Sequence, residues 1–398
     1  MDMNEMPKFN IPSFACKILE RLFEAGEDAY VVGGSLRDMI LGREPNDFDV
    51  ATSAEPSRVL EIFSDMRTIE TGIAHGTVTV LSDGYPIEIT TFRVDGDYID
   101  MRRPESVKFT RCIEDDLSRR DFTVNAMAYN YRVGLVDLFF GARDIERKII
   151  CTVGDPEQRF SEDALRILRA FRFSAKLGFE IEEKTLLATA KLGERLSYIA
   201  KERIFSEFCG IVVAKNAQRA IDLMVDTGVM RYTLLEYCPS KRATELLARV
   251  GEDKVLRLAA FFSEADEACV RRELSALKSP TKLKTSVAKV VDASKKSYST
   301  REDVAHLKAK LFDDARNALE LSVALGNSSC EVLRFLCDNT PYEISQLAIS
   351  GKDLKALGYS GREIGEELSS LLEKVIAEPS LNQEQNLLDI AKKDKDGR

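Results

Sequence analysis

The sequence predicts an α+β fold in which a domain with a mixed β-sheet comes first and an all-helical region follows. Two observations support this prediction. Up to about residue 150, short β-rich runs alternate with amphipathic helical segments, whereas from Ser161 onward apolar residues recur almost everywhere at helical spacing. Breaks in the helical pattern fall near residues 278–280 and 327–329. We expect four segments, namely 1–150, 151–215, 216–325 and 326–398.

The first segment contains the elements of a sheet with helices packed on it. In chain order, the pattern predicts an amphipathic helix over 12–25, a strand over 28–32, a helix over 35–41, a strand over 47–51 and a helix over 56–63. The last of these helices has Pro56 near its N-terminus, where a missing N–H costs least. A glycine pair, Gly33-Gly34, separates the first strand from the helix that follows it.

The clearest supersecondary signal is a β-hairpin. Two runs rich in β-branched residues, Thr77–Leu81 and Pro86–Phe92, are separated by a short segment that contains Asp83-Gly84. This residue pair accepts the positive φ angles of tight turns, so the two runs are expected to pair as antiparallel strands. Farther along, helical spacing predicts helices over 163–176, 217–230, 242–250, 255–262 and 301–324.

The composition excludes several classes of protein. The chain has 398 residues, of which 44% are hydrophobic and 31% charged, and no stretch approaches the roughly 20 apolar residues of a membrane span. Its start is polar and lacks the apolar core of a secretory signal. Eight scattered cysteines without a C-x-x-C pair, and only two histidines, argue against a disulfide framework and a zinc site. We expect a cytoplasmic protein with free thiols and no membrane partner.

The net charge of −9 argues mildly against a nucleic-acid partner, because phosphate contacts need Lys and Arg. Net charge is a weak guide when charge is distributed unevenly. Basic residues gather on one expected helix and its approach, at Arg159, Arg166, Arg169, Arg172 and Lys176. A local basic face within an acidic protein is therefore compatible with the sequence.

The strand expected over 47–51 carries two carboxylates one residue apart. Side chains at positions i and i+2 of a strand point to the same side, so Asp47 and Asp49 are expected to project together while Phe48 turns inward. Such a pair is a natural ligand set for Mg²⁺, which prefers oxygen ligands and often shares its shell with substrate phosphates. A D-x-D pattern alone is equally compatible with a solvated strand end.

The surroundings of this pair favour a site for a nucleotide triphosphate. The strand–Gly33-Gly34–helix arrangement lets the backbone approach an anion, and Arg37 on the first helical turn would add a phosphate contact. Glu88, on the second hairpin strand, is a candidate third carboxylate, either as a metal ligand or as the base for an attacking hydroxyl. A solvent-facing glutamate is the alternative interpretation.

These residues lie in a string, GGSLRDMILGREPNDFDVAT, that resembles the first motif of the bacterial class II tRNA nucleotidyltransferases and poly(A) polymerases, a branch of the polymerase-β-like superfamily. Three further segments follow in the family's order. Residues 119–126 resemble its ribose-recognition motif, 134–141 the hinge between head and neck, and 162–166 the motif that selects the incoming base. The resemblance covers roughly 28–210, with a weaker match over 349–390.

The resemblance implies a polymerase-β-like head over 1–150, a base-selecting neck over 151–215, a body over 216–325 and a tRNA-binding tail over 326–398. Asp47, Asp49 and Glu88 would then be catalytic, with Asp47 and Asp49 holding Mg²⁺. The nucleotide-binding residues that the motifs imply are Gly33, Gly34, Arg37, Arg120, Asp121, Asn125, Asp163 and Arg166.

The two later motifs contain side chains suited to these roles. If the stretch is helical, Asp121 and Asn125 share a face and can both hydrogen-bond ribose hydroxyls, with Arg120 reaching the phosphates; a helix cap at Asp121 is the alternative. Asp163 and Arg166, three apart on the expected helix, can imitate a Watson–Crick edge for cytosine and adenine, which both present an amine. Their alternative is an ordinary ion pair.

Three neighbouring features complete the expected site. Glu162 is expected to orient Arg166, and Arg203 matches a further neck motif with a structural role. The stretch 93–104, which includes Arg102 and Arg103, lacks periodicity and is interpreted as a loop. Family members that add the terminal A retain this loop, so its presence implies competence for that step.

Complete CCA addition, with CTP and ATP as substrates and the 3′ end and acceptor/T arm of tRNA as partner, is the preferred function. An A-adding enzyme and a poly(A) polymerase are the alternatives within the family. An inactive RNA-binding homologue and a nucleotidyltransferase acting on a small molecule are alternatives outside it. The intact acidic pair argues against the inactive homologue, because a binding module has no need for it.

Overall fold

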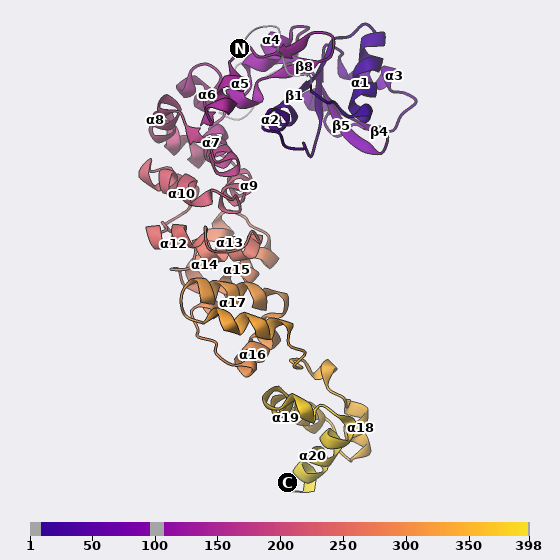
Figure 1. Ribbon diagram of the computed structural model, residues 1–398, viewed down its shortest axis with the longest axis vertical. Helices are drawn as coiled ribbons and strands as arrows, with labels where there is room; N and C mark the ends of the chain where they lie inside the picture. Colours follow the sequence, from indigo (N-terminus) through magenta and orange to yellow (C-terminus); the bar gives the residue numbers. More distant parts are fainter. Residues whose placement is uncertain (1–8, 96–106, 397–398) are drawn as a thin grey trace. The chain divides into compact units, whose positions relative to one another are not determined.

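The computed structural model describes residues 9–95 and 107–396. It forms two compact units, Met1–Leu234 and Leu235–Arg398, and Figure 1 follows the chain from the indigo and violet sheet elements to the orange and yellow helices. The boundaries expected at 150, 215 and 325 do not separate these units and stay predictions of smaller subdivisions. Among the described residues, no helix has both the length and the apolar character needed to cross a membrane.

The first unit contains a seven-stranded sheet with the order β3-β4-β5-β2-β1-β8-β9. Its strands are β1 (Ala29–Val32), β2 (Asp49–Thr52), β3 (Thr68–Ile69), β4 (Thr77–Ser82), β5 (Tyr85–Thr91), β8 (Ala128–Asn130) and β9 (Gly134–Val136). Strands β2 and β5 pair in parallel and their neighbours pair antiparallel. The predicted α+β class with a mixed sheet is therefore confirmed.

The predicted hairpin is present as β4 and β5, with Ser82 paired to Tyr85 at its end. Asp83 and Gly84, the two residues of the turn, have φ values of 51° and 85°. Positive φ at both central residues gives a turn whose twist matches that of the flanking strands, which is why this residue pair closes the hairpin.

Five helices accompany the sheet: α1 (Ser13–Glu24), α2 (Gly34–Ile40), α3 (Pro56–Ile62), α4 (Ile113–Ser118) and α5 (Gly141–Glu146). Leu117 of α4 packs with Tyr30, Ala51 and Phe92 in one apolar cluster, so α4 covers one face of the central strands. The short strands β6 (Arg93–Asp95) and β7 (Val107–Phe109) form a separate antiparallel ribbon. The stretch 93–104 was expected as a loop, but its first three residues form β6, so this part of the prediction is wrong. Residues 96–106, with Arg102 and Arg103 among them, are outside the described part of the chain.

The rest of the first unit is mainly helical: α6 (Pro156–Glu162), α7 (Leu165–Leu177), α8 (Glu183–Leu192), α9 (Lys201–Val212), α10 (Ala217–Asp226) and α11 (Met230–Thr233). Two short parallel strands, β10 (Ile149–Ile150) and β11 (Glu180–Ile181), lie among them. The helix expected from Asp163 begins instead at Leu165. Asp163 has extended φ and ψ angles of −140° and 105°, and its Oδ1 accepts a hydrogen bond from the Leu165 N–H.

The second unit is helical in its described residues: α12 (Lys241–Leu246), α13 (Lys254–Phe261), α14 (Glu267–Ala276), α15 (Thr281–Ser294), α16 (Arg301–Leu311), α17 (Ala315–Ala324), α18 (Gly351–Ala356), α19 (Arg362–Ala377) and α20 (Glu384–Asp396). The single helix expected over 301–324 is wrong. Phe312, with φ at 51°, begins a 3₁₀ turn that divides it into α16 and α17. The predicted break near 278–280 separates α14 from α15.

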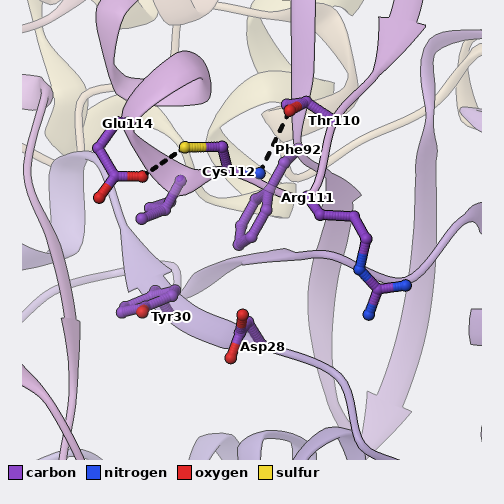
Figure 2. Close-up of a pocket in the computed structure, with 8 residues that line it drawn as sticks. Asp28, Tyr30, Phe92, Thr110, Arg111, Cys112 and Glu114 are labelled. Atoms are coloured by element: carbon purple, nitrogen blue, oxygen red, sulfur yellow. Dashed lines mark hydrogen bonds between the residues drawn. The ribbon is translucent and has the colours of Figure 1, made fainter.

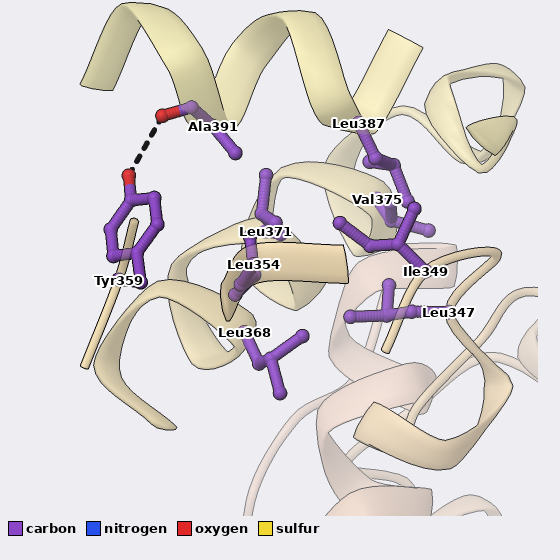
Figure 3. Packing of buried hydrophobic residues seen from close by; sticks show 9 residues of the cluster. All are labelled: Leu347, Ile349, Leu354, Tyr359, Leu368, Leu371, Val375, Leu387 and Ala391. Atoms are coloured by element: carbon purple, nitrogen blue, oxygen red, sulfur yellow. Dashed lines mark hydrogen bonds between the residues drawn. The ribbon is translucent and has the colours of Figure 1, made fainter. Parts of the chain in front are cut away.

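The last three helices share a small apolar core (Figure 3). Leu354 of α18, Leu371 of α19 and Leu387 of α20 are all fully buried in it. The buried hydroxyl of Tyr359 donates a hydrogen bond of 2.7 Å to the Ala391 carbonyl, which ties the end of α18 to α20. This core is what holds three short helices together, because isolated helices of this length are marginal in water.

Leu371→Ala should lower the free energy of unfolding of the second unit by about 2–5 kcal/mol, because it removes buried methyl groups and leaves a cavity. Ser369→Ala is the matched control on the exposed side of the same helix, with an expected change within about 0.5 kcal/mol. The free energy of unfolding of both variants is measured by denaturant titration of the full chain, with the circular dichroism of the helices as the signal. Equal effects of the two substitutions would contradict the assignment of this core.

Candidate active site

The turn after β1 brings the backbone close to two charged side chains. Gly33 has a φ of 77° and immediately precedes α2. A β-carbon at this position would lie 3.3 Å from Nη1 of Arg120 and 3.9 Å from Oδ2 of Asp49. Glycine is therefore required here both for the positive φ and for the close approach. The turn places Gly33, Arg120 and Asp49 around one point.

The strand that carries the aspartates is shorter than predicted. Strand β2 begins at Asp49, so Asp47 lies two residues before it and not within it as expected. Both aspartates are exposed and Phe48 between them is buried, which agrees with the expected projection of the two carboxylates away from Phe48. The strand starts late because only the residues from Asp49 onward pair with β1 and β5.

Glu88 lies next to Asp49 on the neighbouring strand. The two residues are register partners in the parallel β2–β5 pair, so their side chains stand on the same face. Ile87 and Ile89, on either side of Glu88, are fully buried on the opposite face. The structure thus brings two of the three predicted carboxylates side by side on adjacent strands, with the third shortly before β2.

Asp47, Asp49 and Glu88, the acidic group of the site, lie close enough together for their negative charges to repel. The pKa of Asp49 is raised to about 6, first by desolvation and then by the charge of Glu88, with Asp47 adding a smaller effect and Arg120 opposing the shift. A divalent cation would relieve this repulsion, so the donor set fits Mg²⁺. Among the described residues, no three His, Cys, Asp or Glu side chains form a metal site by themselves. Substrate oxygens would have to complete the coordination shell.

Arg37 lies on α2 beside the glycine turn, as predicted. Its side chain is buried, and its guanidinium donates to Asp38 Oδ1 from Nε and Nη2 at 2.9 and 2.8 Å, and to Asn125 Oδ1 from Nη1 at 2.7 Å. These bonds join α2 to the segment around Asn125, so Arg37 positions the helix after the glycine turn. Its phosphate contact stays a prediction.

The stretch around Asp121 is not the helix that would place Asp121 and Asn125 on one face. A 3₁₀ turn (η2) spans only Thr123–Asn125, and Asp121 lies outside it. The buried Asp121 accepts from Arg169 Nε at 2.6 Å and from the Phe122 N–H at 2.9 Å. Burial alone would raise the pKa of Asp121, but the guanidinium of Arg169 outweighs it and holds this pKa below its usual range.

Arg120 is held from both sides. Its Nη2 donates to Asp116 Oδ2 at 3.0 Å and its Nη1 donates to the Asn125 carbonyl at 3.3 Å. Asp116 is 1% exposed and also accepts from Arg119. Burial favours a raised pKa for Asp116, but Arg120 and Arg119 together keep it lowered. This buried carboxylate was missed from sequence, although its spacing three and four residues before the arginines was a usable signal.

Asp163 and Arg166 lie at the junction of α6 and α7 and have separate partners. Arg203 Nη2 donates to Asp163 Oδ2 at 2.9 Å. Arg166 pairs with Glu162 through Nη1, as predicted, and donates to the Arg119 carbonyl from Nη2 at 3.1 Å. Arg203 fixes the aspartate, and Glu162 fixes the arginine.

The first unit contains two cavities that none of Asp47, Asp49 and Glu88 lines. One, of about 450 Å³, is lined by Asp28, Tyr30 and Phe92, together with residues 110–114 (Figure 2). It adjoins the start of β1, whereas Gly33 follows its end. Cys112 donates from Sγ to Glu114 there, and this hydrogen bond raises the pKa of the thiol. The second cavity, of about 820 Å³, borders the 42–48 loop that leads to Asp47.

Comparison with known proteins identifies relatives along the whole chain. Residues 29–151 match the family model described as "Poly A polymerase head domain". Residues 178–240 match the model described as "Probable RNA and SrmB- binding site of polymerase A". A CCA-adding enzyme of Limosilactobacillus fermentum is 37% identical over 94% of this chain and 95% of its own length. One of Streptococcus mutans is 34% identical, covering 96% and 97%.

A solved structure is also similar. The crystal structure of the Bacillus stearothermophilus CCA-adding enzyme in complex with CTP matches with a TM-score of 0.81 and 30% identity, over 98% of this chain and 99% of that chain. The resemblance inferred from the ordered motifs is confirmed by these matches. The chain belongs to the family of CCA-adding enzymes.

Proposed function

We propose that this protein adds C, C and A from CTP and ATP to the 3′ end of tRNA without a nucleic-acid template. Family membership and the acidic face formed by Asp49 and Glu88 beside Gly33 support this function. The observation that carries it is the register pairing of Asp49 with Glu88 on adjacent strands, next to the Gly33 turn. Neighbouring carboxylates repel one another, and such a group is suited to hold a cation and a triphosphate.

The residues that would hold Mg²⁺ are Asp47 and Asp49, with Glu88 as a third ligand or as the base for the attacking 3′-hydroxyl. When bound, the cation supplies positive charge that stabilises the negative charge developing on the phosphates. Arg120 stands next to Gly33 and adds a fixed positive charge on the same side. Attack of the hydroxyl on the α-phosphate then releases pyrophosphate.

Base selection is assigned to Asp163 and Arg166. An aspartate oxygen accepts from the exocyclic amine of cytosine or adenine, and an arginine donates to the ring nitrogen or carbonyl. Because Arg203 and Glu162 hold these two side chains separately, the pair can present a fixed donor–acceptor edge. Uracil and guanine lack the matching amine and would leave Asp163 without a donor.

Ribose contact is assigned to Asn125, whose backbone and side chain are tied to Arg120 and Arg37. Asp121 comes shortly before this segment in the chain, and the hydrogen bond that it accepts from Arg169 helps to hold the segment in place. The role of the tail over 326–398, as a surface for the acceptor and T arm of tRNA, is part of the proposal. A cytoplasmic location is included too, because none of the eight cysteines forms a disulfide in the structure and reduced thiols suit such a compartment.

Incubation with Mg²⁺ and a tRNA that ends before CCA tests the function directly. Three nucleotides added from CTP plus ATP, and two from CTP alone, are expected. A single adenosine added only to tRNA ending in CC would indicate an A-adding enzyme, and long adenosine tails would indicate a poly(A) polymerase. Asp49→Asn should abolish incorporation while tRNA binding is kept. No incorporation by the unchanged protein would contradict an enzymatic function.

The pH dependence of nucleotide addition should report the titration of Asp49. Its carboxylate gains a proton as the pH falls through about 6, and the protonated form cannot hold a cation. The rate should therefore fall on the acidic side. Raising the Mg²⁺ concentration should move this acidic limb to lower pH, since the cation competes with the proton. An acidic limb at the same pH at both Mg²⁺ concentrations would argue against Asp49 as a ligand.

Asp163→Ala should weaken discrimination between nucleotides. We expect the preference for CTP and ATP over UTP and GTP, measured as ratios of kcat/KM, to fall by about tenfold, because one base-edge contact is lost. Glu183→Ala, on the exposed first turn of α8, is the control and should keep the ratio unchanged. If Asp163→Ala lowered kcat/KM equally for all four nucleotides, its role would be structural only.

A further inference from the structure

Phe173 of α7 lies between two arginines of the site region. It is only partly buried, so it is not an ordinary core residue. Cζ of Arg169 lies 5.2 Å from the centre of its ring, and Cζ of Arg37 lies 5.6 Å from it. Phe122 meets the same ring edge-on, with centroids 5.6 Å apart and planes inclined at 75°. Guanidinium groups within about 6 Å of an aromatic face are attracted to it.

Each of the two guanidinium groups also has its own carboxylate. Arg37 is paired with Asp38 at 2.8 Å, and Arg169 is paired with Asp121 at 2.6 Å. The ring of Phe173 thus lies near the guanidinium groups of both Arg37 and Arg169, and each guanidinium is already paired with its own carboxylate. A leucine at this position would fill similar space but would offer no negative face to either arginine.

The ring connects the two halves of the nucleotide site. Arg37 lies on α2, which follows Gly33, and its Nη1 fixes Asn125. Phe173 lies on α7, which begins two residues after Asp163 and carries Arg166. The elements assigned to the triphosphate and those assigned to the base therefore meet at Phe173.

We propose that Phe173 is a positioning residue that sets the distance between the triphosphate-binding turn and the base-selecting junction. This inference rests on the proposed function, since it takes a nucleotide to span both elements. Phe173 does not touch the reacting atoms. It acts by holding α7 against α2 through the guanidinium of Arg37, while Arg169, four residues earlier on α7, packs on the same ring and pairs with Asp121.

Two ligands distinguish a positioning role of Phe173 from simple structural support: CTP, which would span the turn and the base-selecting junction, and tripolyphosphate, which would contact the turn alone. Phe173→Leu should weaken the binding of CTP with Mg²⁺ by about tenfold, measured by calorimetry. Inorganic tripolyphosphate lacks the base and needs only the turn, so its affinity should change less than about twofold. Phe173→Tyr keeps the ring and should restore CTP affinity to within about twofold of the unchanged protein.

Phe23→Leu is the matched control. Phe23 is also partly buried, has the guanidinium of Arg132 4.0 Å from its ring centre, and meets Tyr131 edge-on. This variant should bind CTP and tripolyphosphate like the unchanged protein. The change in its melting temperature measures how much the loss of one arginine–aromatic contact lowers stability when the contact lies outside the site.

Equal weakening of CTP and tripolyphosphate by Phe173→Leu would overturn the inference, because the turn itself would then be damaged. Unchanged CTP binding would overturn it as well. Failure of the unchanged protein to extend tRNA, with the CTP-specific loss still observed, would overturn the proposed function and leave Phe173 as a positioning residue for bound CTP. Absence of CTP binding by the unchanged protein would overturn both.

Discussion

The repulsion among the carboxylates at the start of β2 is the constraint around which the first unit is organised. Asp49 and Glu88 are forced side by side because their strands pair in parallel register. That register is fixed from the other face, where Val50, Ile87 and Ile89 are fully buried. Burial of these apolar side chains stabilises the sheet and so sustains a charge arrangement that is unfavourable by itself. The sheet keeps the site ready for a cation.

Arginine–carboxylate pairs determine how the surrounding segments meet this acidic face. Asp116 holds Arg120, Asp121 holds Arg169, and Asp163 is held by Arg203. The pairs of Asp121 with Arg169 and of Asp163 with Arg203 join segments that are far apart in the sequence, whereas Asp116 and Arg120 are four residues apart at the end of α4. The planar guanidinium has five donors in a fixed geometry, so it fixes direction as well as charge. Lysine at these positions would keep the charge but lose the orientation.

The sequence was informative wherever a local rule decides the conformation. The β4–β5 hairpin follows from alternation and from Asp83-Gly84, and the role of Gly33 follows from its place between a strand and a helix. The junction at Asp163 was predicted wrongly because helical spacing continues through it. Aspartate can accept from a nearby backbone N–H, as it does from Leu165, and this bond competes with helix formation.

Other features had no local signal. The hydrogen bond between Arg37 and Asn125 joins residues far apart in the chain, and only the tertiary structure brings the two together. The break at Phe312 was missed because the flanking residues have helical spacing, although Phe312 itself has a positive φ. Spacing cannot reveal a contact with a distant element.

Arginine–carboxylate pairs also account for most of the basic residues between 159 and 176. The basic residues between 159 and 176 suggested a local surface for phosphates, yet Arg159 and Arg166 pair with Glu162, Arg169 with Asp121 and Arg172 with Glu207. Their positive charge is largely used inside the molecule. Most of the arginines on this helix and its approach therefore orient carboxylates within the protein, and Lys176, which is exposed, is the member of the group that these pairs leave out.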